Sequence, residues 1–392
     1  MTISSTERLA AELAEYHELS SPVYAGFIET LLTLPAQRPI VDTITPEDTV
    51  VVCRREILNE AIAYYQKRYT TLPVFYTFSP NASVYKAESD VIVRDVETLS
   101  SEQKVHIFTS LTARRPGHSG ISFLVRHLAN KNILNPSVEK NSVSRFFDEF
   151  TPEPLRPEDI MNMAACYNQL SDAESKQAYL GICKARLLGD FSYTHLALYP
   201  QYFHPVVHAE EGDILCEGGI CDGKTSVKLT KAIGESGALY GFEPVPECYK
   251  LSLKRTAQSP AIHLENKALW KNTTTLKLSI TNPTQGYSSV ISSGTAEASC
   301  STTSIDEYFS DKPAPTLIKL DVEGAEIPVL EGAMQTIRAH RPKLMVSIYH
   351  TNNGNDLVNI PKFLLDANLG YSFYVGHHSV WFNETILYCI AK

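Results

Sequence analysis

The chain has 392 residues, of which 43% are hydrophobic and 20% are charged, and its formal net charge is -9 at pH 7. A chain of this length exceeds one ordinary hydrophobic core, so two domains are expected. The negative charge, with no Lys/Arg cluster in the sequence beyond short pairs, argues against a nucleic-acid-binding surface.

The N-terminal part of the chain predicts helices followed by a small α/β domain. Apolar spacing indicates helices over residues 6–18 and 23–34. Short β-rich runs then alternate with one amphipathic helix at residues 56–69, which is typical of a parallel sheet; the runs are Thr49–Cys53, Leu72–Phe78, Asp90–Asp95 and Lys104–Ser110. Because no glycine follows the first strand, we expect a scaffold, acceptor-binding or oligomerising role here rather than a cofactor site.

A proline- and acid-rich segment, Thr151–Asp159, predicts a domain boundary. Helical patterns continue from about residue 160 to 188. We therefore predict an N-terminal α/β accessory domain at residues 1–155, a helical connector at 156–200 and a second domain at 201–392.

The C-terminal half shows a clear alternation of strands and helices. Predicted strands are Asp213–Glu217, Ala238–Glu243, Ala261–Asn266, Thr316–Asp321 and Lys343–His350; predicted helices are Lys224–Ile233, Pro246–Thr256 and Glu326–His340. Thr275–Ile280 alternates like a hairpin strand. Two neighbouring strands, at 371–378 and 384–391, close the chain. This is the order of a class I methyltransferase fold, which is Rossmann-like and has a mostly parallel seven-stranded sheet whose last strand is antiparallel.

The stretch Gly218–Thr225, "GGICDGKT", matches G-x-x-x-x-G-K-[ST], the pattern of a nucleoside-triphosphate-binding P-loop. Asp321, at the end of a hydrophobic strand, would be its magnesium-holding partner. However, Glu217 and Asp222 place two carboxylates around this loop, where a polyphosphate would be repelled. S-adenosylmethionine (SAM) carries a sulfonium and an ammonium instead of phosphates, so acidic side chains would attract it.

The candidate cofactor-binding residues follow the ends of the first three strands of this half. Glycines let the backbone approach the ligand where a Cβ would clash. An acid at the end of the second strand can accept hydrogen bonds from ribose hydroxyls, and an amide after the third could meet the adenine edge. The residues are Glu217, Gly218, Gly219, Gly223, Glu243 and Asn266.

Several motifs in residues 201–392 resemble the FkbM-type methyltransferases. They are "YFHP", "GDILCEGGICDGKTS", "YGFEPVPECYKL", "LIKLDVEGAEIPVLEGAMQTI", "RPKLMVSIYH" and "GHHSVWFNETILY". The resemblance implies a SAM-dependent O-methyltransferase that acts on a hydroxyl of a sugar, glycan or secondary metabolite. One departure is Glu217, where the family usually has Asp.

The candidate catalytic residues are Asp321, Glu323 and His350, because ligands of an open α/β sheet lie beyond the carboxyl ends of its strands. Asp321 would orient the methyl donor or acceptor, and His350 is a candidate general base. Glu323 could equally be an acid at the start of a helix, and Glu326 is expected to be the residue that starts that helix. Asp321 and Glu323 alone offer too few oxygen ligands to predict a metal site.

The cysteines form no CxxC pair, and the sequence has neither a signal-peptide pattern nor an apolar run of about 20 residues. We therefore expect reduced thiols, a cytoplasmic protein and no transmembrane segment. The expected partner is a small-molecule or glycan acceptor, and a homo-oligomer is compatible with the sequence. Two alternatives stay open, a P-loop phosphotransferase or NTPase and a non-catalytic scaffold with a methyltransferase fold.

Overall fold

The structure is a computed structural model. It describes residues 5–37, 49–53, 58–66, 69–77, 91–100, 104–108, 137–138, 156–188, 193–282, 287–289, 296–350, 355–379 and 383–392. The chain divides into two compact units. One consists of Met1–Leu9, Leu32–Pro154 and Lys184–Thr194, and the other of Ala10–Leu31, Leu155–Cys183 and His195–Lys392. The linear division at residues 155 and 200 stays a prediction.

The smaller unit contains a parallel five-stranded sheet in the order β3-β2-β1-β4-β5. Its strands are β1 (Thr49–Cys53), β2 (Phe75–Thr77), β3 (Val93–Asp95), β4 (Lys104–Phe108) and β5 (Ser137–Val138), with helix α3 (Leu58–Gln66) and the 3-10 turn η3 (Val96–Thr98). Val51, Tyr65 and Phe75 are fully buried in its core. The predicted small α/β fold is confirmed, and parts of its predicted elements, such as residues 54–57, lie outside the described residues.

Helices precede the main sheet along the chain: α1 (Ser5–Ala14), the 3-10 turn η1 (His17–Ser20), α2 (Pro22–Thr33), α6 (Pro157–Gln169) and α7 (Ala173–Leu188). Helix α6 packs against η1 and against α13 (Asp356–Asp366). Of the helices that the structure describes, none combines the length and the apolar character needed to cross a bilayer.

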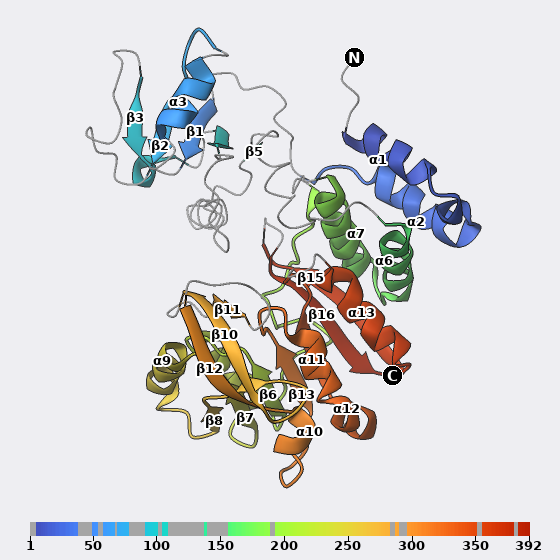
Figure 1. Cartoon of the computed structure of the whole chain (residues 1–392), viewed down its shortest axis with the longest axis vertical. Helices are drawn as coiled ribbons and strands as arrows, with labels where there is room; N and C mark the ends of the chain where they lie inside the picture. Colours follow the sequence, from blue (N-terminus) through green and yellow to red (C-terminus); the bar gives the residue numbers. More distant parts are fainter. Residues whose placement is uncertain are drawn as a thin grey trace. The chain divides into compact units, whose positions relative to one another are not determined.

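The larger unit is built on a seven-stranded sheet in the order β15-β16-β14-β13-β6-β7-β8 (Figure 1). The strands are β6 (Ile214–Gly218), β7 (Ala238–Phe242), β8 (Ile262–Glu265), β13 (Leu317–Leu320), β14 (Lys343–Ser347), β15 (Tyr371–His377) and β16 (Thr385–Ala391). Strand β16 pairs antiparallel with both β14 and β15, and the other pairs are parallel. The predicted fold class, with its antiparallel last strand, is confirmed.

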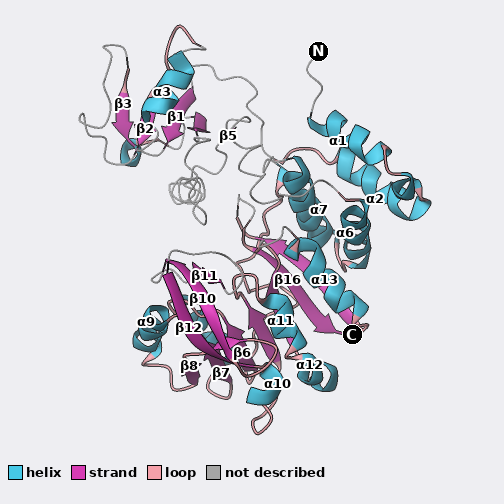
Figure 2. Ribbon diagram, in the orientation of Figure 1, coloured by secondary structure: helices cyan, strands magenta, loops and turns pink. Residues whose placement is uncertain are grey.

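The core of this sheet is made by central strands that are buried on both faces, as parallel strands between helices are. Leu215, Leu239, Leu317 and Met345 come from four neighbouring strands and are fully buried in one cluster. Helices α8 (Lys224–Ile233) and α9 (Pro246–Thr256) contact each other, and α11 (Glu326–Glu331) contacts α13 (Figure 2).

A second, mixed sheet in the order β11-β10-β12-β9 completes this unit. It contains β9 (Ala268–Leu269), β10 (Thr275–Asn282), β11 (Tyr287–Ser289) and β12 (Ala296–Thr303), and β10 pairs antiparallel with its neighbours, as the predicted hairpin strand requires. Leu278 and Cys300 of this sheet pack against Val245 and Cys248. The short helix α10 (Ile305–Tyr308) follows β12 behind a Ser304–Glu307 capping box.

One predicted element is wrong in its extent. The helix expected over residues 326–340 is two helices, α11 and α12 (Met334–His340). The break falls at Gly332, whose carbonyl accepts a hydrogen bond from the backbone N–H of Asp306 at 2.9 Å. The backbone of Trp270 and Lys271 also passes so close that a side chain at position 332 would collide with it. Tertiary packing therefore overrides the helical periodicity here.

Candidate functional site

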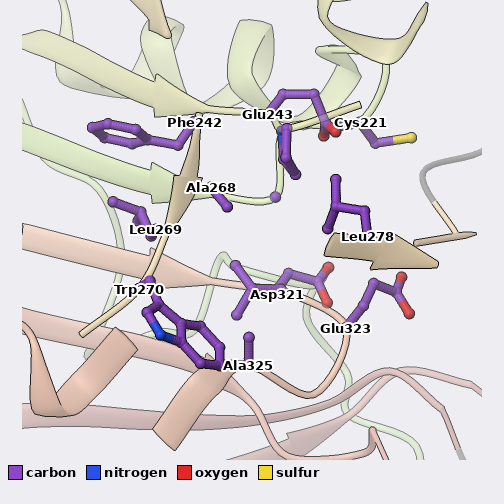
Figure 3. A pocket seen from close by; sticks show the side chains of 13 residues that line it. Cys221, Phe242, Glu243, Ala268, Leu269, Trp270, Leu278, Asp321, Glu323 and Ala325 are labelled. Atoms are coloured by element: carbon purple, nitrogen blue, oxygen red, sulfur yellow. The ribbon is translucent and has the colours of Figure 1, made fainter. Parts of the chain in front are cut away.

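A pocket lies at the carboxyl ends of strands β6, β7 and β13 (Figure 3). It encloses about 690 Å³ of space that protein atoms do not occupy, including space open to solvent. The lining residues are Gly219, Cys221, Phe242, Glu243, Pro244, Ala268, Leu269, Trp270, Leu278, Asp321, Val322, Glu323 and Ala325. The lining that the structure describes thus contains three carboxylates and no Lys or Arg side chain.

The glycine turn after β6 forms one wall of this pocket. Gly219 has a φ of 76°, which only glycine adopts readily, and a Cβ there would collide with the backbone carbonyl of Asp321. Gly223, with a φ of 77°, caps helix α8 and packs against Ser252 of α9. Gly218 is the last residue of β6 and lies beneath Val322. Of the three predicted glycines, only Gly219 lines the pocket.

Glu243, at the end of β7, lines the pocket although its exposed fraction is only 3%. Its Oε2 accepts a hydrogen bond from the backbone N–H of Cys221 at 2.8 Å, and its Oε1 accepts one from that of Val245 at 2.9 Å. Burial raises the pKa of Glu243 to about 7, although these two hydrogen bonds lower it. Each oxygen has a second lone pair, so the carboxylate is held in place and can still accept a ligand hydroxyl.

Glu217 lies below the pocket floor and does not line it. Its side chain is fully buried, its Oε2 accepts a hydrogen bond from Ser226 Oγ at 2.6 Å, and its Oε1 is 3.3 Å from Lys319 Nζ. Lys319 is itself 2% exposed and donates to the carbonyl of Gly219 at 2.9 Å. Glu217 therefore acts on the glycine turn through Lys319, and its predicted contact with the cofactor stays a prediction.

Asn266 is exposed and lies outside the pocket lining. Its Nδ2 donates to the carbonyls of Glu243 at 2.8 Å and Pro244 at 3.3 Å. The side chain thus ties the end of β8 to the loop after β7. The predicted contact with adenine stays a prediction.

The lysine of the P-loop-like pattern does not reach the pocket. Lys224 Nζ pairs with Asp222 Oδ2 at 2.8 Å, and its side chain is 68% exposed. Asp222 also pairs with Arg255 at 3.3 Å. The three charges form a surface network between the turn before α8, the first residue of α8 and the end of α9. The basic group that a P-loop uses to hold phosphate therefore does not face the pocket.

Asp321, directly after β13, receives more hydrogen bonds than its position in the sequence suggests. Tyr202 Oη donates to its Oδ2 at 2.9 Å. Ser347 Oγ and Tyr349 Oη both donate to its Oδ1 at 2.9 Å. Burial alone would raise the pKa of Asp321, but the charges of Lys319 and His350 and these hydrogen bonds bring it below its ordinary value. The side chain is therefore a fixed carboxylate at the pocket wall.

His350 lies behind Asp321 and Glu323, with an exposed fraction of 8%. Its Nδ1 is hydrogen-bonded to Glu326 Oε1 at 2.9 Å, and its Nε2 is 3.4 Å from Asp321 Oδ1 and 3.7 Å from Glu323 Oε2. Burial lowers the pKa of His350, but the surrounding carboxylates outweigh burial and raise it to about 10. The imidazole thus holds its proton at neutral pH, and the predicted role as a general base would require it to lose that proton first.

Glu323 lines the pocket and has a φ of 54°. Desolvation raises the pKa of the Glu323 carboxyl group to about 7, and the positive charge of His350 partly opposes this rise.

Glu326 was expected only to start a helix. It does start α11, and it also connects the loop after β13 with His350. Its Oε1 accepts hydrogen bonds from the backbone N–H of Val322 and from His350, both at 2.9 Å.

Sequence reasoning missed four residues that hold the acidic side of the pocket: Lys319, Tyr202, Ser347 and Tyr349. Two signals were present. Ser347 and Tyr349 are two residues apart near the end of a predicted strand, which places both on one face. Tyr202 lies in the "YFHP" motif, but only the tertiary fold brings it to Asp321, 119 residues further along the chain.

Comparison with known proteins identifies the domain. Residues 218–373 match the family model described as the methyltransferase FkbM domain. A search of curated proteins finds no match.

One solved structure of low sequence identity shows the same fold, and others are similar over about half of this chain. A crystal structure of methyltransferase FkbM from Methylobacillus flagellatus KT aligns with 98% of this chain and 100% of its own, at 17% identity and a TM-score of 0.55. A fibrillarin from Aeropyrum pernix, with natively bound SAM, aligns with 46% of this chain and 68% of its own, at 16% identity and a TM-score of 0.33. The family model thus identifies residues 218–373 as a methyltransferase FkbM domain, and the sheet that contains these residues has the strand order of a SAM-dependent class I methyltransferase.

Proposed function

We propose that this protein transfers the methyl group of SAM to a hydroxyl of a sugar, glycan or secondary metabolite. The observation that carries the proposal is the pocket lining, in which Glu243, Asp321 and Glu323 supply carboxylates and no described residue supplies a basic group. Such a lining attracts a sulfonium and an ammonium and repels a triphosphate. It therefore favours SAM over the alternative of a P-loop phosphotransferase.

For the methyl donor, we propose that Glu243 accepts hydrogen bonds from the ribose hydroxyls and that the backbone at Gly219 lies against the ligand. The missing Cβ at Gly219 leaves the carbonyl of Asp321 in direct contact with the turn. Apolar lining residues such as Leu278 would cover the adenine. This arrangement directs the methyl group towards the acidic loop after β13.

For the acceptor, we propose that Asp321 and Glu323 orient the hydroxyl and accept its proton as the methyl group is transferred. The hydroxyl oxygen forms a bond to the methyl carbon while the bond from carbon to sulfur breaks, leaving S-adenosylhomocysteine (SAH). Positioning supplies much of the rate in such a reaction, and a proton acceptor adds about 10²–10⁴-fold. His350 would act behind these carboxylates as a fixed positive charge.

The sugar, glycan or metabolite acceptor follows from the family resemblance, as does transfer to oxygen. Three further proposals are based on the sequence. They are a cytoplasmic location, a role of the first domain in acceptor binding or oligomerisation, and the absence of nucleic-acid partners. The eight cysteines form no disulfide in the structure, which is compatible with a reducing compartment.

Two measurements test the function. Calorimetric titration with SAH, SAM and ATP should show binding of the first two ligands and none of ATP. A screen of sugar nucleotides and glycans with labelled SAM should then show label on a hydroxyl oxygen. Selective binding of ATP would support the phosphotransferase instead, and a chain that binds none of the three would be the scaffold protein.

A further inference from the structure

Two thiols meet at the wall of the pocket, between the glycine turn and helix α9. Cys221 is in the turn after β6, and its side chain lines the pocket (Figure 3). Cys248 is in the first turn of α9 and is fully buried. Cys221 packs against the cluster that contains Cys248, Val245 and Leu278. A hydrogen bond joins the two thiols, so two cysteines from separate elements are in direct contact.

Cys221 and Cys248 differ in their accessibility, and therefore in the chemical steps that each can perform. Cys221 is partly exposed, whereas the other seven cysteines, including Cys248, are buried. A small oxidant in solution can thus reach Cys221 directly through the pocket. Cys248 is shielded from such a reagent, but it lies where it can react with an oxidised Cys221.

The surroundings of Cys221 favour its thiolate, which is the reactive form of a thiol. The hydrogen bond with the Cys248 thiol has the largest effect and brings the pKa of Cys221 below its ordinary value, although burial and the charges of Glu243 and Asp222 oppose it. Because Cys248 belongs to the first turn of α9, the positive end of that helix dipole also lies beside the pair.

Cys300 offers a comparison within the same cluster. It packs with Cys248, but it is only 6% exposed, and burial raises the pKa of its thiol. Burial likewise raises the pKa of Cys216 and Cys389. Exposure and contact with a second thiol therefore distinguish Cys221 from these three cysteines.

We propose that Cys221 and Cys248 form a reversible disulfide when the protein meets a peroxide. The Cys221 thiolate attacks one oxygen of hydrogen peroxide, the O–O bond breaks, and a sulfenic acid forms while the other oxygen leaves as hydroxide. The sulfur of Cys248 then attacks the sulfenic sulfur, the S–O bond breaks, and the second hydroxide leaves with the proton of the Cys248 thiol as water.

The reaction balances with peroxide as the oxidant. Two thiols and one peroxide give one disulfide and two water molecules, and two electrons pass from sulfur to oxygen. Disulfides that form in reducing compartments are usually transient, because thiol reductants reverse them by exchange. The pair is thus compatible with a chain whose other cysteines stay reduced.

The disulfide would form beside the group that is proposed to bind the ribose. The backbone N–H of Cys221 donates to Glu243 Oε2 at 2.8 Å. In a role that rests on the proposed function, bound SAH would cover Cys221 and slow its oxidation. Formation of the disulfide itself does not depend on that role, and it can be measured in the absence of SAH.

The test is treatment of the fully reduced, full-length chain with hydrogen peroxide, followed by mass spectrometry. The wild-type chain should lose two hydrogen atoms, peptide mapping should find Cys221 linked to Cys248, and dithiothreitol should reverse the change. C221S should reduce this mass loss about tenfold or more, because it removes the reactive thiolate. C248S should instead keep a sulfenic acid at Cys221, which dimedone traps. C221S changes a partly exposed side chain, so it provides a test even if C248S does not fold.

The matched control is C300A, which removes another thiol of the same cluster. It should form the disulfide between Cys221 and Cys248 as the wild type does. The proposal is overturned if the wild type forms no disulfide within the chain, or if peptide mapping links either cysteine to Cys300. Addition of SAH before the peroxide tests the proposed function separately. If the disulfide forms equally fast with and without SAH, the redox pair is still supported, but SAH does not bind next to Cys221.

Discussion

Gly219 packs directly against the backbone carbonyl of Asp321, with no side chain between the glycine turn and the acidic loop. The backbone N–H of Asp321 also donates to the carbonyl of Gly218 at 3.1 Å. The two loops that line the pocket are therefore held together by their main chains. This contact links the donor side of the proposed site to its acceptor side.

Gly219→Ala should abolish SAH binding and lower the melting temperature, because the new methyl group forces the two loops apart. Gly212→Ala is the matched control. Gly212 also has a positive φ, of 86°, but a Cβ there would meet only Ser236 Oγ at 3.6 Å. The control should lose only about 1–2 kcal/mol, the strain of a left-handed residue, and should keep its SAH affinity. Thermal denaturation and calorimetry measure both effects, and equal behaviour of the two variants would contradict the role of the close contact.

Lys319→Met should destabilise the protein by about 3–5 kcal/mol, because it leaves Glu217 buried without its counter-charge. The double variant Lys319→Met, Glu217→Gln should recover part of this loss, since neither charge is then buried alone. The free energy of unfolding in urea measures the difference. If the double variant is as unstable as the single one, the ion pair at 3.3 Å is not the source of the effect.

SAH affinity should fall as the pH is lowered from 8 to 6. Burial raises the pKa of Glu243 to about 7, so below that pH the carboxyl group gains a proton and accepts ribose hydrogen bonds less well. One proton changes the affinity by at most about tenfold per pH unit.

Glu243→Gln should bind SAH more weakly at pH 8 and should lose the part of the pH dependence that comes from this residue. Glu323 also has a pKa of about 7 in the same pocket, so the comparison of wild type and variant isolates the contribution of Glu243. If the variant binds SAH at pH 8 as tightly as the wild type does, Glu243 does not bind the ribose.

Lys224→Ala should leave SAH affinity within about twofold of the wild type, because Lys224 Nζ pairs with Asp222 on the surface. Exposed ion pairs contribute about 0–1 kcal/mol to stability, so the melting temperature should change little. A large loss of SAH affinity would instead support the interpretation of the glycine turn as a P-loop.

The fold and the class of ligand could both be predicted from the sequence. The alternation of β-branched runs with amphipathic helices predicted the main sheet, because burial on both faces imposes continuous apolar strands. Acids and glycines at strand ends predicted the edge of the sheet where the pocket lies, because the carboxyl ends of parallel strands meet at one edge.

Which of these residues face the pocket depends on tertiary packing and could not be predicted from the sequence. Glu217 and Glu243 both lie at strand ends, yet Glu217 turns inward to Lys319 while Glu243 lines the pocket. Spacing along a strand places a side chain on one face, but it does not tell which neighbour from a distant segment will meet it. The partners of Asp321 and the carboxylates around His350 come from such distant segments, so the charge and the protonation of the site follow from packing.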